Sequence, residues 1–581
     1  MAGPAVGVVA PRELHARLRA GRDLVVVDVG TRDEFAAGHL SVATHVPVDH
    51  LEPRLPLLAP RPTVPLVVVG AREETVARAV PRVAALGYTD VSVLDGGLAG
   101  WRAAGGELFT GFNTVSRALG EVALRRLGTP GVCAAELRAA LDAGEDVVVL
   151  DTRTAEEFAY TAIPTAVNAP GVELARRAYA AVRSPRTRVV VTCAGRTRGI
   201  VGAQTLIDAG FPNPVAVLDG GLSAWSLAGY PPATGATARL APPEPAQEAR
   251  AGAAARALAV RAGVAEISAA ELGGFVAAAA DTTLYLFDVR TREEFVGGHL
   301  PGSRWAPGGQ LLQATDEYLA SRGARVVLVD DGCGTRGFTT GVWLARMGLS
   351  KVAVYLLRPG LPGVPGFPGV PGVPGVPGVP GVPGVPGVPG SGVLVRGPET
   401  VPLPEVPTVS VPALRDLLVD GAAVVVDVEP PSAAGWLVAR PYIPGSLVTT
   451  RSALAARPAL APVDGALVVV TSGDGTLARW ATADLRAAGW GRAAALDGGT
   501  RAWREAGQPT ATDSAQQSLD PRQALALPPT RQQRARLHDD YVAWCAALEE
   551  QLHRDGIVSF PVGPLAQADA GARKPGKEVA R

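Results

Sequence analysis

Cysteine and histidine are scarce in this sequence of 581 residues, which contains four of the first and seven of the second. The cysteines stand far apart, and none belongs to a C-x-x-C pair: Cys133, Cys193, Cys333 and Cys545. Structural zinc sites need clustered ligands, and disulfide-stabilised domains need many more cysteines. We therefore expect no metal, no other cofactor and no disulfide framework, which is typical of a cytoplasmic protein.

An excess of charge of one sign is also missing, because 55 Lys and Arg residues balance 55 Asp and Glu residues. This balance argues against a nucleic-acid partner and against a polybasic membrane contact. No apolar run is long and charge-free enough to span a bilayer. The apolar patch near the N-terminus has no basic region before it, so we do not interpret it as a signal peptide.

What the sequence does contain is an internal repeat. Four β-branched runs end in an aspartate, and each follows an amphipathic, helix-like segment: Asp28, Asp151, Asp288 and Asp427. A second apolar run follows at a similar distance every time, and three copies then close with the turn Leu-Asp-Gly-Gly before Trp101, Trp225 or Trp503. Short apolar runs that alternate with helical patterns predict a parallel sheet with helices on both faces. The repeat predicts four such α/β domains, within the three to five that this length suggests.

The repeat also sets the expected boundaries. The third copy lacks the closing turn and runs into a Gly-Val-Pro repeat. The repeat fits the Gly-X-Y rule of collagen, but about ten triplets would form a marginal triple helix, so we interpret it as a polyproline-II spacer or a local repeat expansion. A helical pattern over 530–556 places Tyr541, Cys545, Leu548 and Leu552 on one face. The expected segments are domain 1 at 1–111, a linker at 112–128, domain 2 at 129–236, a linker at 237–263, domain 3 at 264–358, the Gly-Val-Pro linker at 359–392, domain 4 at 393–511, and a C-terminal helix and tail at 512–581.

Several motifs resemble the rhodanese family. They are DTRTAEEF (151–158), IPTAVNAP (163–170), CAGRTR (193–198) and LDGGLSAW (218–225), with the opening motif repeated as DVGTRDEFAAGHL (28–40) and DVRTREEFVGGHLPG (288–302). The order and repetition of the motifs are similar to multi-domain bacterial rhodanese-related sulfurtransferases. The resemblance implies four tandem rhodanese-like domains and sulfur transfer through a cysteine persulfide.

Cys193 is the candidate nucleophile. It follows a buried strand and precedes a helical pattern, so successive N–H groups at the turn can form an anion-binding nest. Such a nest beside Arg196 and Arg198 favours the thiolate, which is the nucleophilic form. The resemblance implies that Cys193 carries the persulfide and that Arg198 closes the loop. The implied cradle consists of Ala194, Gly195, Arg196, Thr197 and Arg198.

Two further residues belong to the candidate site through the same resemblance. Asp151 and Arg153 stand at the end of the strand before the loop, where the family has structural ion pairs. Arg196 adds positive charge suited to an anionic donor such as thiosulfate. Trp225, in the closing turn, is interpreted as a packing residue.

Other chemistries for Cys193 are less favoured. Phosphatases and arsenate reductases of related fold carry five residues between cysteine and arginine, whereas four separate Cys193 from Arg198. A thiol protease needs a histidine base, and residues 129–236 contain none. A buried, inert thiol remains the structural alternative, although two nearby arginines argue against an apolar setting.

The other three domains lack this nucleophile. The position equivalent to Cys193 holds Gly70 in domain 1, Asp331 in domain 3 if Arg336 matches Arg198, and Ser472 in domain 4. Cys333 falls two residues past that position. Cys133 falls at the start of an expected helix, the position that Ser268 occupies in domain 3, where Ser268 and Glu271 form a plausible capping box. We interpret Cys133 and Cys545 as capping or packing residues.

These observations predict a thiosulfate sulfurtransferase. It would move sulfane sulfur from a small anionic donor to a thiol or cyanide, and a homodimer is compatible with the sequence. The alternative from another class is a non-catalytic scaffold, or a persulfide carrier or sensor, because three of the four domains lack the cysteine.

Overall fold

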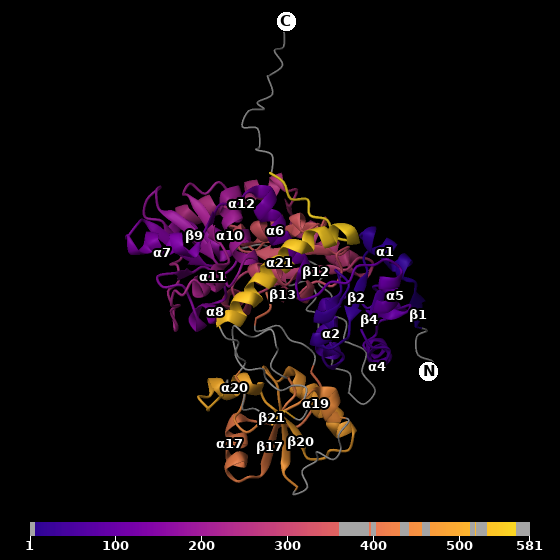
Figure 1. Cartoon of the computed structure of the whole chain (residues 1–581). Helices are drawn as coiled ribbons and strands as arrows, with labels where there is room; N and C mark the ends of the chain where they lie inside the picture. Colours follow the sequence, from indigo (N-terminus) through magenta and orange to yellow (C-terminus); the bar gives the residue numbers. More distant parts are fainter. Residues whose placement is uncertain are drawn as a thin grey trace.

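The computed structural model describes residues 6–358, 394–396, 403–429, 441–455, 465–511, 517–518 and 531–564. Within them the chain forms four parallel sheets in tandem (Figure 1). In every sheet, five strands follow the same order. Numbered within the domain, it is 1-5-4-2-3, so the first strand lies at one edge and the short third strand ends the series. The predicted fold of four tandem α/β domains is confirmed, and the Gly-Val-Pro tract lies outside the described residues.

The first domain contains a five-stranded sheet. Its strands are β1 (Gly7–Val9), β2 (Val25–Asp28), β3 (Thr44–His45), β4 (Leu66–Val69) and β5 (Val91–Leu94). Its helices are α1 (Pro11–Arg19), α2 (Arg32–Ala37), α3 (Leu51–Leu58), α4 (Glu73–Ala85) and α5 (Gly97–Ala103), with the 3-10 helix η1 (Val48–His50). A capping box between Thr31 and Glu34 starts α2, which fits the Thr-x-x-Glu pattern.

The second domain repeats this plan. Its strands are β6 (Gly131–Val132), β7 (Val147–Asp151), β8 (Val167–Asn168), β9 (Arg188–Thr192) and β10 (Val215–Leu218). Its helices are α7 (Ala134–Asp142), α8 (Ala155–Tyr160), α9 (Glu173–Ala181), α10 (Thr197–Asp208) and α11 (Gly221–Leu227). Cys133 is the first residue before α7, and its sulfur accepts a hydrogen bond of 3.4 Å from the N–H of Glu136, so the predicted capping role is confirmed.

The third domain ends with its last strand among the described residues. Its strands are β11 (Ala265–Glu266), β12 (Leu284–Asp288), β13 (Arg304–Trp305), β14 (Arg325–Asp330) and β15 (Val352–Leu356). Its helices are α13 (Ala269–Ala277), α14 (Arg292–Gly297), α15 (Gly308–Gln313) and α16 (Thr335–Arg346), with η2 (Ala278–Ala280) and η3 (Thr315–Glu317). The predicted capping box of Ser268 and Glu271 starts α13.

The fourth domain has a sixth strand. Its strands are β16 (Thr408–Val409), β17 (Ala423–Asp427), β18 (Leu447–Val448), β19 (Leu467–Thr471), β20 (Ala493–Leu496) and β21 (Gln517–Ser518). Its helices are α17 (Val411–Val419), α18 (Arg451–Ala455), α19 (Thr476–Ala487) and α20 (Gly499–Glu505). β21 comes from the segment expected to be a tail and adds to the edge of the sheet beside β18.

The central strands bury side chains on both faces, because helices cover both sides of each sheet. Along β9, Val189 and Val191 belong to one hydrophobic cluster and Val190 to another. The first cluster continues into the third domain, where it includes Val326 and Leu328 of β14. The second and third domains therefore share one core.

Three further helices connect the domains: α6 (Thr114–Leu127), α12 (Pro245–Arg261) and α21 (Arg531–Asp555). The first two occupy the segments interpreted as linkers, and α6 packs against α10 and α21, while α12 packs against α9 and α16. α21, yellow in Figure 1, is the predicted C-terminal helix, and it buries Cys545, Leu548 and Leu552 as expected. In the described parts of the chain no helix combines the length and apolar character needed to cross a membrane.

The C-terminal end of α21 is attached to the first domain. The Ser41 hydroxyl donates a hydrogen bond of 2.6 Å to Asp555, and the Gln551 side chain donates one of 3.0 Å to the Leu108 carbonyl. Leu548 and Leu552 also enter a cluster with Phe109 of the first domain. The last helix therefore ties the first domain to the second.

The fourth domain, orange in Figure 1, contacts the first through Arg451 at the start of α18. Its guanidinium pairs with Glu52 of the first domain and with Asp484 of its own domain, at 2.6 Å in both cases. The Arg451 side chain is only 4% exposed, so this ion pair is shielded from solvent. Ser452 adds a hydrogen bond of 3.1 Å to Asp49.

Candidate active site

Cys193 lies between the end of β9 and the start of α10, as predicted. Its side chain is buried, with 3% of its surface exposed. A Cβ added at Gly199 in the first turn of α10 would lie 3.1 Å from the Val217 side chain of β10 and 3.6 Å, an ordinary contact distance, from the Cys193 sulfur. The glycine therefore lets α10 pack closely against β10 beside the thiol.

The Leu-Asp-Gly-Gly turn and the first residues of α11 that follow it hold the backbone of the Cys193 loop in place. Leu222 donates its N–H to the Cys193 carbonyl at 2.9 Å, and Ser223 donates its N–H and its hydroxyl to the Ala194 carbonyl at 3.0 and 2.8 Å. Gly221 has a φ of +55°, and a Cβ there would lie 2.5 Å from the Cys193 carbonyl oxygen. Only glycine fits this approach, which explains why the turn and the loop occur together.

Arg198 does not point freely into the loop. Its two terminal nitrogens pair with both carboxylate oxygens of Glu157 in α8, at 2.7 and 2.8 Å. Burial alone would raise the pKa of Glu157, but the hydrogen bonds and charge of Arg198 outweigh it and hold the pKa below its ordinary value. Burial alone would lower the pKa of Arg198, but Glu157 outweighs it and raises the pKa, with smaller contributions from Cys193 and Asp151.

Arg196 is paired in the same way. It contacts both oxygens of Glu121 in α6, at 2.6 and 2.8 Å. Both arginines that the sequence assigns to the cradle are thus matched by carboxylates. Neither pairing could be assigned from the sequence, because Glu157, within DTRTAEEF, fits a capping box and Glu121 lies in a segment interpreted as a linker.

Asp151 and Arg153 form a fully buried ion pair at 2.7 Å. Arg153 also donates to the Thr161 carbonyl, and the Asn168 side chain donates to the backbone carbonyls of both residues of the pair. These contacts join β7, α8 and β8 at the carboxyl edge of the sheet. Trp225 is fully buried in a hydrophobic cluster with Phe158 of α8 and Val190 of β9, as predicted.

Two helices outside the domain cover the loop, which sequence reasoning missed. A Cβ on Gly195 would lie 3.7 Å from the ring of Tyr541 in α21, and one on Gly220 would lie 3.2 Å from the ring of His538. Gly120 of α6 fits against Thr197 in the same way, at 3.1 Å. The periodicity of 530–556 predicted the buried face of the helix but carried no signal for its partner.

An apolar cavity of about 30 Å³ lies behind the loop, between the second and third domains. It is lined by Thr197 and Arg198 of the loop, Leu174 and Ala175 of α9, and Trp343 of α16, among others. A space of this size holds about two water molecules. Cys193 itself does not line it.

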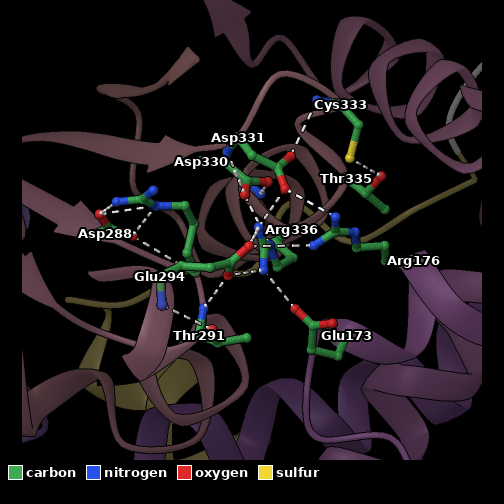
Figure 2. Close-up of polar contacts among 12 residues, drawn as sticks. Glu173, Arg176, Asp288, Thr291, Glu294, Asp330, Asp331, Cys333, Thr335 and Arg336 are labelled. Atoms are coloured by element: carbon green, nitrogen blue, oxygen red, sulfur yellow. Dashed lines mark hydrogen bonds and ion pairs between the residues drawn. The ribbon is translucent and has the colours of Figure 1, made fainter. Parts of the chain in front are cut away.

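The equivalent site in the third domain is filled by carboxylates. Figure 2 shows four of them turned toward Arg336 at the start of α16. The partners of the guanidinium are Glu294 and Asp331 at 2.7 Å, Glu173 at 2.8 Å and Asp330 at 2.9 Å. Burial opposes ionisation of Glu294, but Arg336 outweighs it and lowers the pKa of Glu294 to about 2. Arg336 pairs with Glu294 as Arg198 does with Glu157, and an aspartate stands where a thiol would be.

Cys333 is unsuited to nucleophilic work. Burial raises the pKa of its thiol to about 12, so the thiolate is rare at neutral pH. Its sulfur comes within 4.8 Å of carboxylate oxygens of Glu248 and Asp331, a grouping with metal-ligand atoms. Arg176 already binds both carboxylates, with Asp331 at 3.2 Å and Glu248 at 2.8 Å, so the negative charge is balanced. This group carries no metal assignment.

The remaining two domains have lost the loop in different ways. In the fourth domain Ser472 is fully buried and accepts a hydrogen bond from the Ala478 N–H, while the Gly473 N–H donates to the carboxylate of Glu429 at 2.6 Å. In the first domain Gly70 offers no side chain for chemistry. Arg72 in this loop pairs with Glu34 at 2.6 Å and with Glu74 at 3.5 Å.

Comparison with known proteins gives two substantial matches. The family model described as Rhodanese-like domain matches residues 10–104, 134–228 and 269–363, which are the first three domains. The crystal structure of thiosulfate sulfurtransferase from Pseudomonas aeruginosa is 38% identical, covers 95% of this chain and 99% of that chain, and superposes with a TM-score of 0.77.

Smaller matches cover a single domain. The Alr3790 protein from Anabaena sp. is 30% identical over 18% of this chain and 82% of its own, and the BH2092 protein from Bacillus halodurans is 24% identical over 18% and 77%. Both have a TM-score of 0.17. No curated protein matches the sequence.

Proposed function

Because the chain belongs to the rhodanese-like domain family, we propose that it is a sulfurtransferase that works through a persulfide on Cys193. The donor is thiosulfate or a related small anion, and the acceptor is a thiol or cyanide. The observation that supports this most directly is the placement of a thiol at the turn from β9 to α10, where the other three domains have a carboxylate, a hydroxyl or no side chain.

The reaction has two steps. The Cys193 thiolate attacks the outer sulfur of thiosulfate, the sulfur–sulfur bond of thiosulfate breaks, and sulfite leaves with the bonding electron pair. The N–H groups of Ala194, Gly195, Arg196 and Thr197 would donate to the persulfide anion, because successive N–H groups at a strand-to-helix turn form an anion nest. An acceptor thiolate or cyanide then attacks the terminal sulfur and releases the Cys193 thiolate.

The other domains support this site rather than repeat it. The third domain shares a core with the second, and α9 of the second domain supplies Glu173 to the buried ion network around Arg336. One loop that holds a thiol, beside three equivalent loops that hold a carboxylate, a hydroxyl or no side chain, fits one catalytic centre. The alternative function, a persulfide carrier or sensor, differs from this one only in lacking repeated turnover.

Intact mass spectrometry tests the proposal. The full-length protein is incubated with thiosulfate, freed of the excess and weighed, beside Cys193→Ser and the matched control Cys333→Ser. We expect a gain of about 32 Da in the wild type and the control, no gain in Cys193→Ser, and loss of the added mass on treatment with cyanide. A folded wild type that gains no sulfur from thiosulfate or other sulfane donors would refute the proposal.

Steady-state turnover separates the enzyme from the carrier. With thiosulfate and cyanide in excess, an enzyme forms many equivalents of thiocyanate per chain. A carrier would form no more than about one equivalent of thiocyanate per chain. That result would replace the catalytic proposal with the carrier. An arsenate reductase or phosphatase would instead act on arsenate or an oxyanion ester, which the short loop between Cys193 and Arg198 disfavours.

A further inference from the structure

The positive charge expected at the Cys193 loop is largely cancelled. Arg196 is bound to Glu121 and Arg198 to Glu157, each through two hydrogen bonds. A thiosulfate dianion that approaches the loop releases a sulfite dianion, so charge builds up beyond the reacting sulfur. The loop itself holds no unpaired cation, so positive charge beyond that of its backbone N–H groups would come from another part of the chain.

Arg117 of α6 is placed to do so. Its guanidinium lies 5.9 Å from the ring centre of Tyr541, the residue that covers Gly195. No carboxylate within the described ranges forms an ion pair with Arg117, in contrast to Arg125 and Arg126 on the same helix, which pair with Glu549. Arg117 is therefore a half-buried cation that remains available to an anion.

Tyr541 provides a hydrogen-bond donor at the same place. Burial raises the pKa of its phenol, so the hydroxyl keeps its proton across the neutral range. The phenol is hydrogen-bonded with Cys545, one turn further along α21, and it lies close enough to Cys193 and Arg117 to interact with their charges. Cys545 is itself 1% exposed and lies in the field of Arg117 and Arg196.

We propose that Arg117 and Tyr541, carried by two helices outside the Cys193 domain, bind the oxyanion end of the sulfur donor over the Cys193 loop. The inference rests on the proposed function and specifies its substrate class. Arg117 holds the charge that ends on sulfite, and Tyr541 donates a hydrogen bond to one of the sulfonate oxygens. The donor is thus a small anion whose negative charge lies on oxygen, next to the sulfur that is transferred.

Single-turnover kinetics test this inference. The second-order rate constant of persulfide formation is measured by quenched intact mass, with thiosulfate as the dianionic donor and methanethiosulfonate as the monoanionic one. The variants are Arg117→Gln, Arg117→Lys and Tyr541→Phe. Arg125→Gln is the matched control, because it removes one charge from the same helix but lies in the contact with Glu549 rather than over the loop.

We expect Arg117→Gln to slow the reaction with thiosulfate by roughly 10- to 100-fold, the effect of a lost charge-assisted hydrogen bond, and the reaction with methanethiosulfonate by clearly less. Arg117→Lys should retain most of the preference for the dianion, and Tyr541→Phe should slow both donors about tenfold. Arg125→Gln should react like the wild type.

Two results would overturn the inference. One is an Arg117→Gln rate within about twofold of the wild type for both donors, the scatter expected of a surface change. The other is an equal loss with both donors that Arg117→Lys does not restore, since a purely structural role predicts it. Failure of the wild type itself to form a persulfide would refute the proposed function instead, so the two failures are distinguishable.

Discussion

Replacing Arg336 by methionine should destabilise the core that the second and third domains share. The guanidinium is 1% exposed and binds four carboxylates, which come from both domains (Figure 2): Glu173, Glu294, Asp330 and Asp331. Methionine occupies a similar volume, so the substitution removes the charge and leaves the acids without their common partner. One of them, Asp330, already has its pKa raised to about 6 by burial.

The magnitude follows from the burial. Removing one partner of a buried ion pair costs about 3–5 kcal/mol of unfolding free energy, because the remaining charge stays desolvated. For a unit of this size the melting temperature should fall by about 2–4 °C per kcal/mol, which gives a decrease on the order of 10 °C. At pH 5 the loss should be smaller than at pH 7.5, since Asp330 then accepts a proton more readily and part of the uncompensated charge disappears.

Calorimetry of the full chain at pH 7.5 and pH 5 measures both effects. Arg415→Met is the control, because Arg415 and Asp416 form an exposed ion pair, with 55% and 66% of the side chains accessible, and such pairs contribute about 1 kcal/mol or less. A decrease for Arg336→Met no larger than that of the control would refute the role assigned to the network. An equal decrease at both pH values would refute its electrostatic origin.

Two other substitutions have clear expected outcomes. Asp28 has Gly30 where Asp151 has Arg153, and burial without a counter-charge raises its pKa to about 7. Its contribution to stability is present in full below the unfolded pKa near 3.8 and is progressively lost as the pH rises to about 7. Asp28→Asn should therefore stabilise the first domain more at pH 8 than at pH 5, with a gain of up to a few kcal/mol at about 1.4 kcal/mol per pKa unit. Urea unfolding at both pH values measures this, and the same difference at each would contradict it. Arg451→Met should weaken the contact between the fourth and first domains and speed hydrogen exchange in α3 and α18. Arg479→Met, which removes a more exposed ion pair, should leave the exchange rates unchanged. Unchanged exchange in Arg451→Met would show that other contacts hold the two domains together.

The repeat made the architecture predictable from sequence. Continuous apolar runs such as the one before Asp151 can only be buried on both faces, and their constant spacing from the closing turn reveals copies of one domain. The short loop after Cys193 also follows from sequence, because the strand, the thiol and the helix are consecutive. These features are local, and local order is what a sequence displays most directly.

The surroundings of Cys193 were not predictable in the same way. Glu121, Tyr541 and Arg117 are distant in sequence from the loop, and nothing in their own segments marks them as neighbours. Arg198 shows the difference. Its place in the loop was expected, but its ion pair with Glu157 was not, because the sequence marks Glu157 only as part of the capping box that starts a helix. Partners that meet only through the packing of domains carry no periodic signal.

The path of α21 bears on how this protein can be divided. Its final turns are fastened to the first domain through Asp555 and Gln551, while its Tyr541 covers the loop of the second. A fragment that contains only residues 129–236 would keep Cys193 and its turn but lose α21, whose Tyr541 covers them. Such a fragment would present an open thiol to solvent, and its choice of donors and acceptors would describe a different catalyst from the whole chain.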